Sequence, residues 1–143
     1  MQNDFDCGLR IANCGFEKNH AKKNMTPDAL RKRTKDFALG IIRLVETLLK
    51  CKTAEVLGRQ PLRSRTSVGA NYRSACRARS SADFISKMSI VEEEADESIY
   101  WMELIVESGL LDELRPNNLL TEAKEILAIT VSSINTARKG QKK

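Results

Sequence analysis

Residues that could bind a metal are few in this chain and poorly spaced for it. The 143 residues include one histidine, His20, and four cysteines. Cys7 and Cys14 have no metal-type pair nearby, while Cys51 and Cys76 each stand alone in a helical pattern. Structural zinc sites need four thiol or imidazole ligands at short, regular spacings. We therefore expect no metal site and reduced thiols.

Catalytic motifs are equally scarce. The sequence has no P-loop, no G-x-G-x-x-G fingerprint and no nucleophile elbow. A nucleophile paired with histidine would have to use His20, and a di-iron bundle needs two Glu-x-x-His motifs, which one histidine cannot supply. These gaps predict a protein that is not an enzyme and needs no cofactor.

The most suggestive side chains are arginines. Residues 53–79 contain six arginines, no lysine and one acidic residue, Glu55. A guanidinium group matches phosphate geometry with paired donors, so this composition favours directed contacts to phosphates. The candidate nucleic-acid-binding residues are Arg63, Arg65, Arg73, Arg77 and Arg79.

The next segment has the opposite charge, which leaves three interpretations open. Residues 80–109 contain one lysine and eight acidic residues, including the cluster Glu92–Glu94 with Glu97. The basic and acidic segments could neutralise each other within one chain, or an acidic face could meet the basic face of another subunit. Alternatively, the arginines could remain free for phosphates. We interpret the acidic cluster as a solvated or interface face.

Four amphipathic helices are predicted to position these residues. The first begins at Thr26-Pro27-Asp28, where a capping hydroxyl, a proline at the first helical position and an acid follow one another. It should end near residues 50–52. Its apolar residues recur at helical spacing: Leu30, Phe37, Ile41, Leu44, Val45 and Leu48.

The second helix is expected from about residue 53 to residue 78, with a bend or fresh start at Pro61, whose ring removes a backbone donor. Small residues near Gly69 should let a neighbouring helix approach closely. The expected inner face is Leu57, Pro61, Ser64, Val68, Tyr72 and Ala75.

Ser80 or Ser81 should cap the third helix, which Gly109 ends in the left-handed conformation. The fourth should begin after Pro116, with Asn117 or Asn118 as its cap, and end by residue 140. The third helix's expected inner face is Phe84, Met88, Val91, Ala95, Ile99, Met102 and Val106. The fourth helix's is Leu119, Leu120, Ala123, Ile126, Leu127, Thr130 and Ile134.

Together these elements predict an all-α fold, an antiparallel up-down-up-down four-helix bundle over residues 25–143. Residues 1–24 lack a sustained apolar period and are interpreted as a flexible N-terminal tail, with a functional arm as the alternative. No segment approaches the roughly 20 apolar residues of a membrane span, and no secretory signal is evident. We therefore expect a cytoplasmic protein with no membrane partner.

Several runs resemble one known family. The run from Arg63 to Arg73, R-S-R-T-S-V-G-A-N-Y-R, is the most specific. Ala82 to Lys87, Tyr100-Trp101 and the run from Glu107 to Leu111 follow in the same order. Across residues 27–138 the chain resembles the 23S rRNA intervening-sequence proteins, which are four-helix bundles.

This resemblance implies a homopentameric ring with a basic surface, no enzyme activity and binding to structured RNA rather than DNA. Related bundles are accessory proteins of diversity-generating retroelements, so a reverse transcriptase or another protein is an implied partner. The leading hypothesis is thus a nucleic-acid-binding oligomer. The alternative is a structural homo-oligomer or protein adaptor that binds no nucleic acid.

Overall fold

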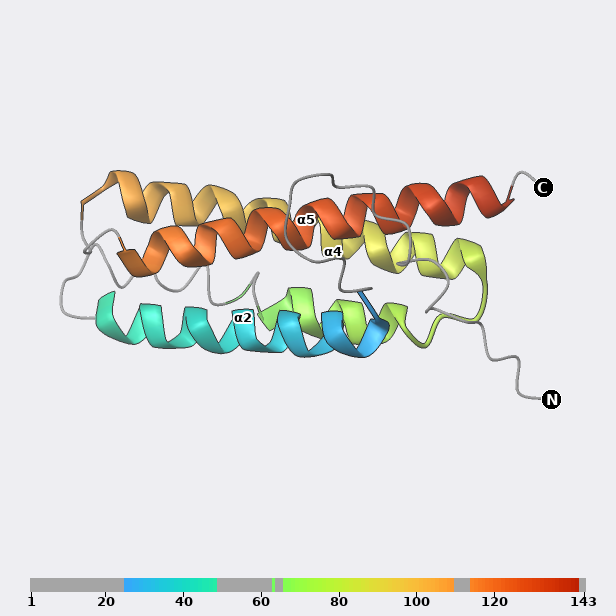
Figure 1. Ribbon diagram of the computed structural model, residues 1–143, viewed down its shortest axis with the longest axis horizontal. Coiled ribbons are helices and arrows are strands. Elements are labelled where there is room, and N and C mark those ends of the chain that lie inside the picture. Colours follow the sequence, from blue (N-terminus) through green and yellow to red (C-terminus); the bar gives the residue numbers. More distant parts are fainter. Residues whose placement is uncertain (1–24, 49–62, 64–65, 110–113, 142–143) are drawn as a thin grey trace.

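The computed structural model describes residues 25–48, 63, 66–109 and 114–141 (Figure 1). Three long helices are α2 (Pro27–Leu48), α4 (Ser81–Glu107) and α5 (Leu114–Gln141). A further helical segment, residues 66–75, lies between α2 and α4 in the sequence. These ranges contain helices and turns but no strand, which confirms the predicted all-α four-helix fold.

Neighbouring helices run in opposite directions, as Figure 1 shows. Near the start of α2, Arg33 contacts Glu122 of α5. Seven residues further along α2, a Cβ atom built on Gly40 would lie 2.7 Å from Cδ2 of Leu119. The α5 partner moves back along the sequence as α2 advances, so these two helices are antiparallel.

The 66–75 helix packs antiparallel against α2 as well. A Cβ atom built on Gly69 would lie 3.6 Å from the carbonyl oxygen of Thr34. Further along, the hydroxyl of the buried Tyr72 donates to the carbonyl oxygen of Pro27 at 3.5 Å. A Cβ atom at Gly69 would thus make an ordinary van der Waals contact with the backbone of α2.

The core follows a seven-residue repeat in each helix. Buried positions alternate steps of three and four residues, the pattern of left-handed bundles whose helices cross at about 20°. In α2 these positions are Leu30, Thr34, Phe37, Ile41, Leu44 and Leu48, and in the 66–75 helix they are Val68, Tyr72 and Ala75. In α4 they are Phe84, Met88, Val91, Ala95, Ser98, Met102 and Ile105. In α5 they are Pro116, Ala123, Ile126, Thr130, Ser133 and Ala137.

The predicted core of α2 is confirmed, but one detail of α4 is wrong. In α4 the buried residue near the end is Ile105 and not Val106, because the seven-residue repeat continues with a step of three from Met102. In α5 three leucines predicted to face inward pack against the core and are half-buried: Leu119, Leu120 and Leu127. Leu57, Pro61 and Ser64 lie outside the described residues.

The predicted helix starts are confirmed for α2 and α4. The amide of Ala29 donates to the hydroxyl of Thr26 at 3.1 Å. Ser80 is the cap of α4, since its hydroxyl accepts from the amide of Asp83 at 3.1 Å. Gly109 has φ +64°, and its amide donates to the carbonyl of Val106 at 3.2 Å. This left-handed ending of α4 was also predicted.

The predicted start of the last helix is wrong. α5 begins at Leu114, so Pro116 lies inside its first turn and Asn117 and Asn118 follow it within the helix. A proline is tolerated there because the first amides of a helix have no partner within the helix. The tail of residues 1–24, the bend at Pro61 and the end of the first helix at residues 50–52 lie outside the described residues.

Candidate nucleic-acid interface

Four of the five candidate arginines can be placed, and all four are exposed. Arg63, Arg73, Arg77 and Arg79 are solvent-accessible, whereas Arg65 lies outside the described residues. Within the described part of the chain, none of these four guanidinium groups belongs to an ion pair. Arg79 interacts electrostatically with Asp83 of α4, but no acid of α4 forms an ion pair with any of the four among the described residues. The placed guanidinium groups are available to an external anion.

The buried side of the 66–75 helix fixes the direction of Arg73. Tyr72 and Ala75 are buried against the other helices, so Arg73 between them projects outward. Arg77 follows one turn later, but the α-helix ends at residue 75 and not near 78 as predicted. A tighter turn continues there, with the amide of Arg77 donating to the carbonyl of Ser74 at 3.0 Å.

Arg79 stands at the entrance of α4. Its backbone amide donates to Oδ2 of Asp83 at 2.9 Å, and Lys87 donates to the same oxygen at 2.8 Å. The hydrogen bond from Lys87 and then the one from the Arg79 amide lower the pKa of Asp83. The Asp83 carboxylate is thus engaged by Lys87 and by the backbone, while the Arg79 side chain stays exposed.

Not every arginine of the bundle is available in this way. Arg33 is half-buried, and its Nε and a terminal nitrogen bind the two carboxylate oxygens of Glu122 at 2.5 and 2.8 Å. Glu125 accepts a further hydrogen bond. The hydrogen bond to Glu122 is the main cause that raises the pKa of Arg33. This arginine joins α2 to α5 and is not part of the candidate interface.

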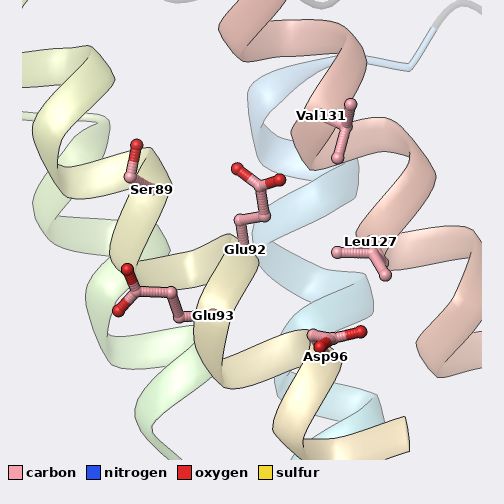
Figure 2. Close-up of a pocket in the computed structure, with 6 residues that line it drawn as sticks. All are labelled: Ser89, Glu92, Glu93, Asp96, Leu127 and Val131. Carbon is pink, nitrogen blue, oxygen red and sulfur yellow. The ribbon is translucent and has the colours of Figure 1, made fainter.

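Acidic side chains gather on a different side of the bundle, between α4 and α5. A shallow groove of about 540 Å³ is lined by Ser89, Glu92, Glu93, Asp96, Leu127 and Val131. Figure 2 shows the Glu92 carboxylate directed toward α5, beside the two apolar side chains. Because its carboxylates would repel phosphates, this groove is not part of the candidate nucleic-acid interface.

The acidic residues do not form a metal site in the described part of the chain. No group of three or more His, Cys, Asp or Glu side chains there is arranged to hold an ion. Among the described helices, none combines the length and apolarity needed to cross a membrane.

An aromatic pair lies on the outer part of α4. The Tyr100 and Trp101 rings meet edge to face, with centroids 5.3 Å apart at 68°. Trp101 donates from Nε1 to Oε1 of Glu97 at 3.1 Å, and Tyr100 is 55% exposed. The Tyr100 ring thus lies exposed on the surface of α4, beside acidic side chains.

Comparison with known families agrees with this architecture. Residues 29–132 match the family model described as 23S rRNA-intervening sequence protein. The chain belongs to this family. The match includes the candidate arginines and all of α4, and it confirms the resemblance seen in the sequence.

A solved structure of the same kind supports the assignment. It is a Bacteroides thetaiotaomicron protein with unknown function from the S23 ribosomal protein family, 33% identical to this chain with a TM-score of 0.71. The alignment covers 76% of this chain and 97% of the other. Comparison with curated proteins gave no match.

Proposed function

We propose that this family member is a non-enzymatic, oligomeric nucleic-acid-binding protein of the cytoplasm, with structured RNA favoured over DNA. The observation that carries the proposal is the set of four exposed arginines, Arg63, Arg73, Arg77 and Arg79, that have no ion-pair partner among the described residues. Arg65 completes the candidate set by its sequence position.

The physical basis is the release of counterions from phosphates. Each phosphate neutralised by an arginine adds about −0.9 to the slope of log affinity against log salt for duplex DNA, and about −0.7 for a single strand. Arginine also provides paired donors in one plane, which fit a phosphate better than a lysine does. The family name points to a ribosomal RNA context, which favours RNA.

The test compares binding of a fluorescein-labelled RNA hairpin by the full chain and by the double variant Arg73→Ala/Arg77→Ala. We expect the double variant to bind the hairpin more weakly at low salt. The slope of its log affinity against log salt should be less steep by between about one and two. Its melting temperature should stay nearly unchanged, because both side chains are exposed. The proposal would be refuted if the unmodified protein caused no gel shift of the hairpin at low salt.

A structural oligomer or protein adaptor is the second candidate, and the exposed Tyr100 beside acidic residues favours it. In that function the acidic face of α4 contacts another subunit, as in a homopentameric ring, or a basic protein such as a reverse transcriptase. Loss of assembly in the Arg73→Ala/Arg77→Ala variant, without nucleic-acid binding by the unmodified protein, would support this candidate instead.

A further inference from the structure

We propose that α2 supplies the second wall of the phosphate-binding surface, through Arg31 and Lys35. The inference rests on the proposed function and extends it from one helix to a surface that spans two. Sequence reasoning assigned the binding residues to the arginine-rich segment alone. The structure brings two cations of α2 to the same side of the bundle.

Arg31 lies on the side of α2 that packs against the 66–75 helix. The hydroxyl of Tyr72 donates to the carbonyl oxygen of Pro27, which lies four residues, about one turn, before Arg31. The Arg31 guanidinium also interacts electrostatically with the side chain of Cys76, which directly precedes Arg77. Arg31 therefore lies on the side of α2 that faces the arginine-rich segment.

Lys35 extends this basic edge along α2. It lies four residues after Arg31, which places the two side chains on neighbouring positions of one helix face. Lys35 is exposed and belongs to no ion pair among the described residues. A nucleic-acid backbone that crosses this surface would thus meet cations from both helices.

One acidic residue works against this surface. Asp28 binds the Arg31 guanidinium at 3.0 Å, and its own side chain is 84% exposed. This ion pair places a carboxylate beside any phosphate that binds Arg31. Asp28 should therefore weaken binding, an effect opposite in sign to that of Arg31.

The acidic groove lies on another side of the bundle and provides a matched control. Arg138 lies seven residues, or two turns, after Val131, which lines that groove with α4. Arg138 is exposed like Arg31 but belongs to the face that α5 shares with α4. Replacing it removes the same charge away from the proposed site.

The experiment measures affinity of the full chain for the RNA hairpin between about 50 and about 200 mM salt, with single variants. Arg31→Gln and Lys35→Gln should each weaken binding several-fold at low salt and flatten the slope by about 0.7 to 0.9. Asp28→Asn should tighten binding. Arg138→Gln should leave the slope unchanged, and melting temperatures identify any variant that is misfolded.

The outcomes separate the two proposals. In one outcome the unmodified protein binds the hairpin and Arg73→Ala/Arg77→Ala weakens binding, but Arg31→Gln and Lys35→Gln have as little effect as Arg138→Gln. In that case α2 does not contribute to binding, and the proposed function stands. Tighter binding by Asp28→Asn supports a binding role for α2 even if Arg31→Gln proves unstable. If the unmodified protein does not bind the hairpin, both proposals fail.

Discussion

At the scale of single residues, the arginines of this bundle differ in whether they form ion pairs with another helix. Arg33 is bound on two sides by glutamates of α5, while Arg73 and Arg77 have no ion-pair partner within the described residues. The residue type is the same, and only the position on the helix decides its role. A guanidinium facing a neighbouring helix finds carboxylates, whereas one facing outward remains available to a ligand.

Asp83 gives a prediction about acid stability. Its pKa is lowered by Lys87 and the Arg79 amide, so the folded chain binds a proton there less readily than the unfolded chain. The ionised Asp83 carboxylate therefore stabilises the folded chain. This stabilisation is fully present above the ordinary aspartate pKa of about 4, and it is lost as the pH falls through the lowered pKa of Asp83. The melting temperature of Asp83→Asn should therefore lie below that of the unmodified protein at neutral pH, with a gap that narrows below about pH 4.

Thermal melts across this pH range check the prediction. Lys87→Gln removes the largest cause of the lowered Asp83 pKa. The melting temperature of this variant should therefore depend less on pH over the same interval. A gap between the unmodified protein and Asp83→Asn that stays constant through the acid range would contradict the assignment.

At the scale of elements, two glycines differ in their backbone conformation. Gly109 ends α4 with φ +64°, a conformation that costs an L-residue about 1–2 kcal/mol. Gly69 instead lies inside a helix beside Thr34, where a Cβ atom would make an ordinary contact at 3.6 Å. The same substitution should therefore have opposite effects at the two positions.

Gly109→Ala should lower the free energy of unfolding by about 1 kcal/mol because alanine is strained in the left-handed region. Gly69→Ala should raise it by about 0.5–1 kcal/mol, since alanine favours the helix and has room. Urea unfolding of both variants measures these changes. Destabilisation by Gly69→Ala would mean that the contact with α2 is tighter than the structure indicates.

At the scale of the whole molecule, the charges lie on separate sides of the bundle. The groove between α4 and α5 carries Glu92, Glu93 and Asp96, while the side shared by α2 and the 66–75 helix carries Arg31 and Arg73. A bundle with one basic and one acidic side can present the first to an anion and the second to another protein. This arrangement supports both an RNA-binding surface and an oligomer.

We predict that the chain is an oligomer, because α4 otherwise leaves Tyr100 exposed beside its glutamates. Light scattering at tens of micromolar should give a mass several times that of the 16.1 kDa chain. Tyr100→Ser should reduce this mass if the aromatic surface lies in the interface, whereas Lys35→Gln, on α2, should not. A monomer mass for the unmodified protein would contradict the prediction.

The amino-acid sequence by itself determined the helices, their caps at Thr26 and Ser80, the ending at Gly109 and nearly all of the α2 core. These features depend on local spacing and backbone preference, which a sequence displays directly. It misplaced the start of α5, because a proline in a first turn resembles one that precedes a helix. Only the tertiary structure decided that Arg33 pairs with Glu122 and that the Tyr72 hydroxyl donates to the carbonyl of Pro27. Both contacts join residues far apart in the chain, and helix periodicity does not determine which faces of separate helices meet.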